Sequence, residues 1–276
     1  MDLYEKLLEE LKRAVRILPP DVEALIMSAR SREESALGRM VLDRIAENIS
    51  AARSGPVPLC QDCGMFHALV RVGRSCPYSM AEIGDEITRA CRDAAEEAWY
   101  RRSTVSDPVY DRVNTGDNLP VVFNWELEDG ASVTADILLK GFGSENCSSV
   151  RMLRPTDGED GVIGAVLDMV RAAGGKPCPP MFLGIGIGGT MDKAAMLSKK
   201  ALVREAGSRH PDPRYAKLEE TILERVNSLG IGPGGLGGCC SALSVAVETC
   251  PTHIAGLPVA LSVNCWADRK AHVEVM

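Results

Sequence analysis

Hydrophobic side chains recur every three or four positions from the start of the chain, which is the spacing of one face of an α-helix. The first such stripe consists of Leu3, Leu7, Leu8, Leu11, Ala14, Val15 and Leu18. Pro19-Pro20 interrupts it, because proline lacks the amide hydrogen that a continuing helix needs. A second short helix is predicted from the stripe Val22, Leu25, Ile26 and Ala29.

Two more helices are predicted in the same way. The third has the stripe Leu37, Met40, Val41, Ile45 and Ile49, and the fourth, over 81–100, has Ile83, Ile87, Ala90, Cys91, Ala94 and Ala98. Ser31 followed by Glu34 is typical of a capping box, which predicts that the third helix starts there. We expect residues 1–54 to form a helical N-terminal region.

The pattern changes after residue 105. An irregular polar loop at 114–118 precedes two apolar runs, VVFNWELE and SVTADILLK. Both runs are rich in β-branched and aromatic residues, and the turn-forming pair Asp129-Gly130 separates them, so each is predicted to be a strand. The loop GFGSENCSS follows the second run.

Helices and strands alternate in the rest of the chain. Helices are predicted over 159–173 and about 213–228, strands near 243–249 and 258–264, and a strand and helix from MFLGIGIGGTMDKAAMLSKKAL. No low-complexity linker or internal repeat divides the sequence. We therefore predict one α/β domain of mixed α+β type over 1–276, in which a mixed-sheet region follows the N-terminal helices.

Composition and charge disfavour several classes of protein. The 276 residues are 45% hydrophobic and 25% charged, which suits a globular protein with a substantial core. The net charge is −7 and no Lys/Arg run is long enough to follow a phosphate backbone, so nucleic-acid binding is disfavoured. No apolar run reaches the roughly 18 residues of a membrane span. The N-terminus is charged and amphipathic, unlike a signal peptide, and we expect a cytoplasmic location.

The candidate chemistry lies in three cysteines, each within a short block of Gly, Pro, Asn, Asp and Gln. The blocks are PLCQDCGM around Cys60, GGKPCPPMFLGIGIGGT around Cys178 and LPVALSVNCWADRKA around Cys265. Ten cysteines without an export signal favour metal or catalytic use over disulfides. A structural zinc site usually has four protein ligands, whereas three thiolates leave one position of a metal or iron–sulfur centre open. The pattern favours an enzyme whose metal centre acts as a Lewis acid.

A dinucleotide site is an alternative interpretation of the glycines after Cys178. Gly184, Gly186 and Gly189 satisfy the G-x-G-x-x-G pattern between a predicted strand and helix, and Glu205 has roughly the spacing of a ribose-binding acid. This unit lies two-thirds along the chain, however, and bare amides at a helix start bind a carboxylate equally well. An NAD-binding oxidoreductase is therefore kept as an alternative function.

Five blocks of the sequence resemble the successive motifs of the oxygen-sensitive iron–sulfur hydro-lyases, the class I fumarases and L(+)-tartrate dehydratases. They are CQDCGM, KGFGSEN, PCPPMFLGIGIGGTMDKAAMLSKKAL, GIGPGGLGG and ETCPTHIAGLPVALSVNCWADR, in unbroken order from about residue 55 to 270. The resemblance covers the α subunit of that family. It implies reversible hydration of fumarate to L-malate, with L(+)-tartrate or another small dicarboxylate as the alternative substrate. It also implies a separate β subunit that completes the active site, in a heteromer of α2β2 type.

The resemblance also implies roles for particular residues. Cys60, Cys178 and Cys265 match the ligands of a 4Fe–4S cluster. The matching catalytic positions are Asp62 and His253, although the family's proton-abstracting residue usually lies on the β part. The matching substrate-binding positions are Gln61, Asp62, Arg101, Gly143, Ser144 and Asn146. Arg102 is adjacent to Arg101 and competes with it for the same role.

Several of these residues have simpler explanations. Asp62 could cap a turn after Cys60, and Arg101 could be a surface cation near a helix end. His253 could be a hydrogen-bonded core residue. Arg269 is expected to pair with an acid and brace the Cys265 loop.

The chain departs from the family pattern at other cysteines. Cys63 stands where threonine is usual, Cys147 follows SEN, and Cys239-Cys240 stand where small hydroxyl residues are common. Cys60, Cys63, Cys239 and Cys240 could instead form the four-thiol site of a non-catalytic zinc- or cluster-binding module.

Overall fold

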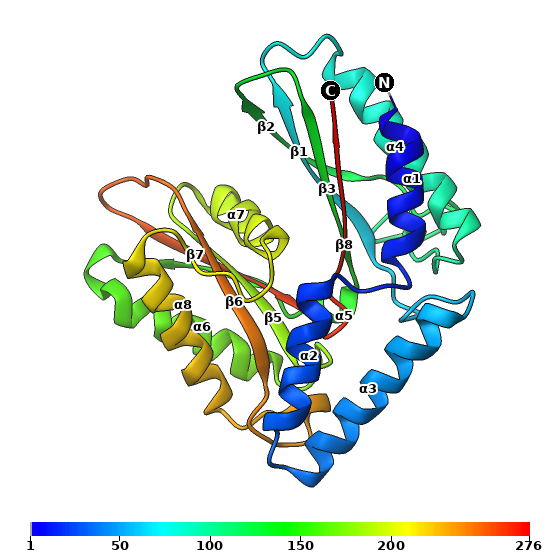
Figure 1. The fold of residues 1–276 in the computed structure, drawn as a ribbon. Helices are drawn as coiled ribbons and strands as arrows, with labels where there is room; N and C mark the ends of the chain where they lie inside the picture. The colour runs from blue at the N-terminus through cyan, green and yellow to red at the C-terminus, as the bar shows by residue number, and fades with distance from the viewer. Residues whose placement is uncertain (1) are drawn as a thin grey trace. The chain divides into compact units, whose positions relative to one another are not determined.

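The structure, a computed structural model, describes residues 2–276. The chain divides into two compact units, each with its own four-stranded sheet (Figure 1). The first unit contains the chain up to Pro19, Asn48–Phe142 and Ala267–Met276. The second contains Pro20–Glu47 and Gly143–Trp266. The predicted mixed α/β class is confirmed.

The sheet of the first unit has the strand order β2-β1-β3-β8. The bounds are Met65–Gly73 (β1), Val122–Glu128 (β2), Val133–Lys140 (β3) and Arg269–Val275 (β8). β1 is parallel to β2, whereas β3 is antiparallel to both β1 and β8. The two strands predicted after residue 105 are confirmed as β2 and β3, but β1 lies between them in the sheet.

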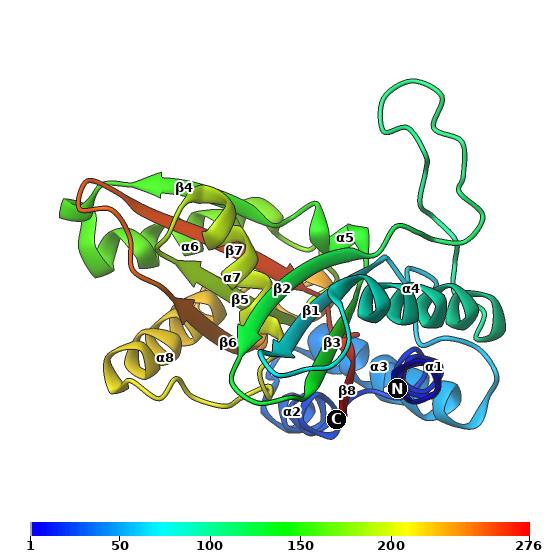
Figure 2. The same cartoon turned by 90° about the horizontal axis from the view of Figure 1, so that it is seen from above.

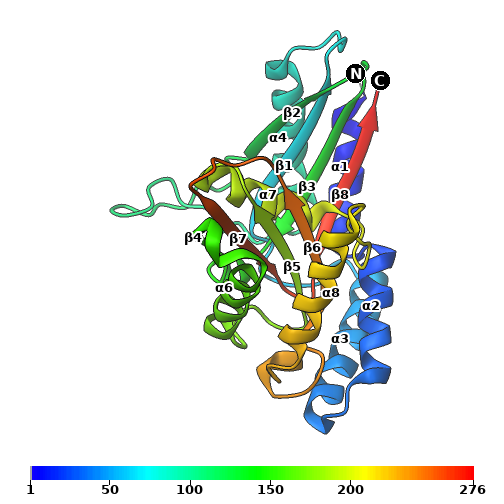
Figure 3. The same ribbon diagram turned by 90° about the vertical axis from the view of Figure 1, so that its left-hand side faces the viewer.

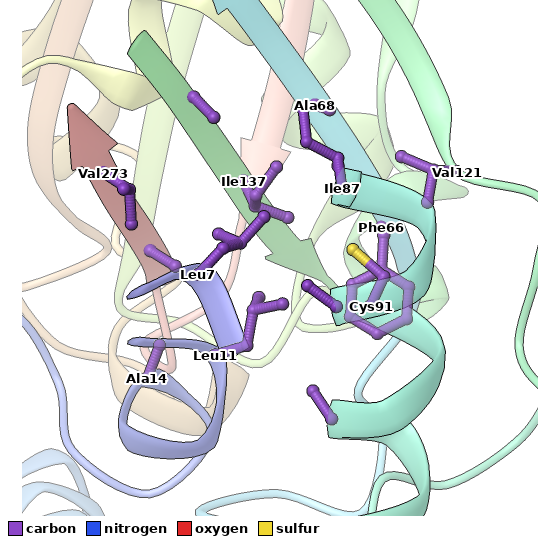
Figure 4. Close-up of a cluster of buried hydrophobic side chains, with 14 of the residues drawn as sticks. Leu7, Leu11, Ala14, Phe66, Ala68, Ile87, Cys91, Val121, Ile137 and Val273 are labelled. Atoms are coloured by element: carbon purple, nitrogen blue, oxygen red, sulfur yellow. The ribbon is translucent and has the colours of Figure 1, made fainter. Parts of the chain in front are cut away.

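Two helices pack on this sheet, α1 (Leu3–Ala14) and α4 (Met80–Glu97). The predicted apolar stripes are buried except for Leu8, which is half-buried. Figure 4 shows part of the resulting core, which includes Leu7, Leu11, Phe66, Ile87, Cys91, Ile137 and Val273. α4 begins with a capping box, because the Ser79 hydroxyl accepts the Glu82 N–H and the Glu82 carboxylate accepts the Ser79 N–H.

The chain between α4 and β2 makes a long excursion from the helix and the sheet of its unit (Figure 2). Its base is held by Asn118, which is fully buried. The side-chain oxygen of Asn118 accepts the N–H groups of Ser103 and Thr104 at 3.0 and 3.2 Å. These bonds fix the backbone just after Arg101 and Arg102, so the position of both arginines is set by a buried amide.

The sheet of the second unit has the strand order β4-β7-β5-β6. The bounds are Ser149–Leu153 (β4), Met181–Ile187 (β5), Ala242–Thr249 (β6) and Leu257–Asn264 (β7). β5 is parallel to β6, and β7 is antiparallel to both β5 and β4. Helices α6 (Gly158–Ala173) and α8 (Pro213–Asn227) cover one face, and α7 (Met191–Val203) covers the other (Figure 1).

The glycines of β5 allow α7 to approach the strand closely. A Cβ atom on Gly184 would collide with the carbonyl oxygen of Ser198, and one on Gly186 with that of Ala194. Both carbonyls belong to α7. These two glycines are therefore needed for helix–sheet packing, which explains them without a bound dinucleotide.

A short turn at residues 33–35 joins helix α2 (Pro20–Arg32) to helix α3 (Ala36–Ser54) (Figures 1 and 3). The predicted Ser31–Glu34 capping box is wrong, since Ser31 lies inside α2 and its hydroxyl donates to the Ser28 carbonyl. The hydroxyl of Ser35 instead accepts the Gly38 N–H. Leu37 and Met40 are exposed, and Leu42 is buried in place of them. The predicted stripe is therefore wrong in the first turn of α3 but right for Ile45 and Ile49, which are buried.

Three strands were not predicted from the sequence: β1, β4 and β8. The remaining short elements are α5 (Phe142–Glu145) and two 3-10 turns, Pro155–Asp157 and Pro233–Gly235. Within residues 2–276, none of the helices combines the length and the apolar character that crossing a membrane requires.

Candidate functional site

The loops that carry Cys178 and Cys265 meet at one end of the sheet of the second unit. Cys178 precedes β5 and Cys265 follows β7, and these strands are antiparallel neighbours with Phe182 opposite Asn264. The Trp266 N–H donates to the Cys178 carbonyl at 3.4 Å. Two of the three predicted cluster ligands are therefore brought together within one unit.

The backbone around Cys178 presents the thiol outward. Cys178 is exposed, and its φ of 55° lies in the left-handed region that non-glycine residues rarely adopt. Pro179 and Pro180 follow it and are buried. Residues held in such conformations are typical of functional sites, where surrounding contacts over-determine the backbone.

The GFGSEN loop is joined to the Cys265 loop through Asn264. Ser144 is buried, and its hydroxyl donates to the side-chain oxygen of Asn264 at 3.4 Å. The same oxygen accepts the Cys265 N–H at 3.1 Å. Asn264 is fully buried, so this amide fixes both the predicted substrate loop and the predicted ligand loop. Sequence analysis did not single out Asn264, although an amide directly before a ligand cysteine is a detectable signal.

A cavity of about 580 Å³ lies beside this loop. It is lined by Gly143, Asn146, Cys147, Ser148, Ser149, Arg151, Met169, Ala172, Ala173 and Lys176. Two predicted substrate residues, Gly143 and Asn146, therefore line one concave site together with the cations of Arg151 and Lys176. Lys176 also lies two residues before Cys178, which the sequence analysis did not use.

The third predicted ligand, Cys60, lies in the first unit, in the loop that leads into β1. Gln61 is exposed and Asp62 is half-buried. The Asp62 carboxylate accepts the Gly64 N–H at 3.2 Å. A Cβ atom on Gly141 would come within 2.8 Å of Asp62 Oδ2, so glycine there leaves room for the carboxylate. Asp62 does cap a turn, as its simpler explanation stated.

Arg269, the first residue of β8, contacts the Cys60 loop, which the sequence analysis did not predict. It was expected to brace the Cys265 loop, but its guanidinium donates to the Asp62 carbonyl at 2.6 Å and so braces the Cys60 loop. The side chain is 1% exposed, and Nε and Nη1 have no oxygen or nitrogen hydrogen-bond partner among the described residues, while the guanidinium lies close to the Cys63 thiol. A buried guanidinium with two unsatisfied N–H groups favours an anionic group nearby.

Cys63 is a buried thiol inside the same loop. Burial raises its pKa, and this effect outweighs the attraction of the Arg269 charge and the hydrogen bond from the Arg101 N–H, which lower the pKa. Its sulfur lies 3.7 Å from the Cys60 carbonyl oxygen, and the Arg101 N–H donates to it at 3.4 Å. Cys63 therefore acts as a packed, hydrogen-bonded group that connects the Cys60 loop to Arg101.

Arg101 and Arg102 differ in their surroundings. Both are exposed, but the Arg102 guanidinium donates to the Gly116 carbonyl at 2.8 Å. For the Arg101 guanidinium, no hydrogen bond or ion pair occurs within the part of the chain that the structure describes. This difference favours Arg101 over Arg102 as the cation available to a ligand.

His253 lies in the exposed loop between β6 and β7, and its Nδ1 accepts the Ala255 N–H. It is therefore not a buried core residue. This loop precedes β7, whereas Cys265 follows it, and a strand of 8 residues spans about 26 Å. Within the second unit, His253 is thus at the opposite end of β7 from Cys265. Its catalytic role stays a prediction.

The cysteines of the alternative four-thiol site are divided between the units. Cys60 and Cys63 belong to the first unit and Cys239 and Cys240 to the second. Within the second unit, the group of side chains that approach closely enough to share a metal ion is Glu33, Cys239 and Cys240.

Comparison with known sequences identifies the class of protein that these features define. The fumarate hydratase (Fumerase) family matches residues 4–274, which is nearly the whole chain. The chain belongs to this family.

Individual relatives with similar sequences are named as alpha subunits of L(+)-tartrate dehydratase. A Methanocaldococcus jannaschii protein named "Putative L(+)-tartrate dehydratase subunit alpha" is 40% identical, over 98% of this chain and 96% of its own length. The L(+)-tartrate dehydratase subunits alpha of Escherichia coli K12 and Shigella sonnei are each 33% identical, over 94% of this chain and 86% of theirs.

Proposed function

We propose that this chain is the α component of a 4Fe–4S-dependent hydro-lyase that reversibly hydrates fumarate to L-malate. The observation that carries the proposal is the junction of the Cys178 and Cys265 loops at one end of β5 and β7. The match of nearly the whole chain to the fumarate hydratase family supports the same reaction class. We further propose that residues 1–276 act as one catalytic domain, because each unit is assembled from non-contiguous segments of the chain.

The residues fit an iron–sulfur cluster with Cys60, Cys178 and Cys265 as ligands. Thiolates are the usual ligands of such clusters, and exposed Cys178 and half-buried Cys265 have their loops hydrogen-bonded together. The unsatisfied guanidinium of Arg269 beside the Cys60 loop favours a negatively charged group. When bound, a three-cysteine cluster supplies a Lewis-acidic iron with an open coordination position.

The chain's own residues would bind and orient a dicarboxylate. Arg101 offers a planar guanidinium to one carboxylate, a pairing that is often bidentate. Gln61 and Asp62 supply polar groups beside Cys60, with Asp62 oriented by the Gly64 N–H. Gly143, Ser144 and Asn146 approach the substrate from the GFGSEN loop. We assign the proton-transfer step to Asp62 and the partner subunit, with His253 as a residue to test.

L(+)-tartrate is the second candidate substrate, and a specific observation favours it. The relatives at 33–40% identity are named as alpha subunits of L(+)-tartrate dehydratase. L(+)-tartrate and L-malate are both hydroxylated four-carbon dicarboxylates, so the same arginine and loop groups would bind either one.

The names of these relatives also support a separate β subunit, and we propose an α2β2 heteromer located in the cytoplasm.

The test is reconstitution of the full chain with iron and sulfide under anaerobic conditions, followed by addition of its β chain. We expect about four irons per chain and hydro-lyase activity only when both chains are present. Rates with L-malate and with L(+)-tartrate decide between the substrates. The Cys178→Ser variant should be inactive and Cys76→Ser active. A chain that takes up zinc but no iron, or that binds NAD instead of either diacid, would contradict the proposal.

A further inference from the structure

The turn between α2 and α3 carries a buried carboxylate that holds a distant loop. Glu33 is 2% exposed and follows directly after the last residue of α2. Its Oε1 accepts the N–H groups of Ser35 at 2.8 Å and Cys239 at 3.1 Å, and its Oε2 accepts the Cys240 N–H at 2.9 Å. Burial raises the pKa of Glu33, but the hydrogen bonds from these N–H groups together lower it by more, so the pKa lies below its usual value. Glu33 is therefore charged at neutral pH.

Two thiols lie beside this carboxylate. The Sγ atoms of Cys239 and Cys240 are 3.9 Å apart. Two thiolates bound to one tetrahedral zinc ion, at about 2.3 Å each, would be about 3.8 Å apart. The two sulfurs and a Glu33 oxygen all lie within 4.8 Å of one another. The spacing of the three groups therefore suits ligands of one ion.

Two helix carbonyls face the thiols, and the positive charge of Arg32 also lies nearby. The sulfur of Cys239 lies 3.4 Å from the Arg32 carbonyl oxygen, and that of Cys240 lies 3.7 Å from the Ala29 carbonyl oxygen. Both carbonyls belong to the last turn of α2, where the helix dipole places partial negative charge. The carbonyl of Glu33 itself is taken by the guanidinium of Arg39. The thiol pair thus lies between a helix carboxyl end and a buried carboxylate.

We propose that Cys239, Cys240 and Glu33 bind a zinc ion that ties the α2–α3 turn to the loop before β6. Two sulfurs and one oxygen suit zinc, whereas magnesium and calcium take oxygen ligands. Three protein ligands leave one position for water, and exposed Cys239 provides the route of entry. This site is independent of the proposed cluster ligands and of the proposed reaction.

Zinc binding has a clear proton requirement at this site. Burial, followed by the neighbouring Cys239 group, raises the pKa of the Cys240 thiol to about 12. The metal-free thiol is therefore protonated at neutral pH, and zinc must displace its proton.

The proposal is tested by dialysing the full chain against a buffer that fixes a low free zinc concentration, and then measuring zinc per chain by mass spectrometry. Wild type and the matched control Cys76→Ser should each hold one equivalent more zinc than Cys239→Ser or Cys240→Ser. Because Cys239 is exposed, Cys239→Ser should fold normally, which its melting temperature in chelator would verify. Zinc should raise the melting temperature of wild type and Cys76→Ser but leave that of Cys239→Ser unchanged. Glu33→Gln should bind zinc more weakly.

Two results would overturn the proposal. One is equal zinc content in wild type, Cys239→Ser and Cys240→Ser. The other is recovery, from the purified chain alkylated without prior reduction, of an unalkylated Cys239–Cys240 peptide about 2 Da light, since a disulfide between the two cysteines would exclude the zinc site.

Discussion

The two units hold their cysteine loops by different means. In the first unit, the Cys60 loop is held by a charged side chain, because buried Arg269 donates to the Asp62 carbonyl. In the second unit, the Cys178 and Cys265 loops are held by the Trp266 N–H and by the neutral amide of Asn264. The first unit therefore contributes charge to its loop, and the second contributes a fixed backbone.

The sheets of the two units also differ, because a central strand of the first carries a charged residue and a central strand of the second carries glycines. β3 of the first unit is buried along its whole length and carries Asp136, which pairs with Arg71 and His272. β5 of the second unit is also fully buried, but it carries glycines against α7. An added side chain on β5 should therefore disturb the packing of α7 in the second unit, whereas a change of charge at Arg269 should affect binding in the first unit.

The largest effect on stability should come from Gly186→Ala. Its new methyl group would meet the α7 backbone at Ala194, which cannot move aside as a flexible side chain can. We expect the free energy of unfolding to fall by about 3 kcal/mol. Gly164→Ala is the matched control in the same unit, because its Cβ meets no atom within 4 Å and it lies inside α6. That change should raise the free energy by about 0.5–1 kcal/mol. Denaturant unfolding of both variants is the measurement. A neutral Gly186→Ala would show that the contact between β5 and α7 does not depend on this glycine.

Arg269→Met should separate function from stability in the first unit. Methionine fills a similar volume and removes a buried charge that lacks two hydrogen-bond partners, while losing one bond to the Asp62 carbonyl. We expect the free energy of unfolding to change by less than about 2 kcal/mol. Iron retention and activity should fall at least about tenfold. Unfolding curves and iron analysis on the same sample provide the measurement. Loss of stability with full iron content would show that Arg269 is only structural.

A smaller effect is expected from Arg101→Ala, with Arg102→Ala as its neighbouring control. Arg102 already donates to the Gly116 carbonyl, whereas Arg101 is the exposed cation proposed to bind substrate. In the enzyme with its β chain, KM for the diacid should rise about ten- to a hundredfold for Arg101→Ala. It should change by no more than about threefold for Arg102→Ala. The reverse order would reassign the substrate arginine.

The smallest effect should come from the cap of α8 in the second unit. The side chain of Asp212 accepts the Arg214 N–H, and the Arg214 guanidinium followed by that N–H lowers its pKa to about 2. A depressed pKa stabilises the folded state fully above the usual value of 3.8, and this contribution disappears as pH falls through about 2. Asp212→Asn should therefore lower the melting temperature slightly at pH 6, and by less at pH 3. If the difference in melting temperature between wild type and Asp212→Asn became larger at pH 3, the Asp212 carboxylate would not stabilise the protein through its charge.

Much of the fold could be predicted from local patterns. The stripes of α1 and α4 repeat over several turns, and their buried residues were identified correctly. The runs that became β2, β3, β6 and β7 combine β-branched, aromatic and other apolar residues over seven or eight positions. The meeting of the Cys178 and Cys265 loops was implied only by the family resemblance, since their partner strands are separated by more than seventy residues.

The missed features depend on contacts between distant segments. β1 contains His67 and Arg71, which break its apolar pattern, and Arg71 finds its charge partner in Asp136 only after folding. β8 largely alternates buried with less buried positions, but its pairing with β3 joins residues at least 130 positions apart. The burial of Arg269 follows from that pairing, so its role at the Cys60 loop could not be predicted from local sequence.

The proposed ligands of the 4Fe–4S cluster are Cys60, Cys178 and Cys265. The most direct test is iron and acid-labile sulfide per chain after anaerobic reconstitution of Cys60→Ser, Cys178→Ser and Cys265→Ser, with Cys76→Ser as the control. The proposal predicts that each of the three variants loses the cluster and its visible absorbance, while the control keeps both. Full iron and sulfide content in any one of the three, or their loss in Cys76→Ser, would contradict this ligand set.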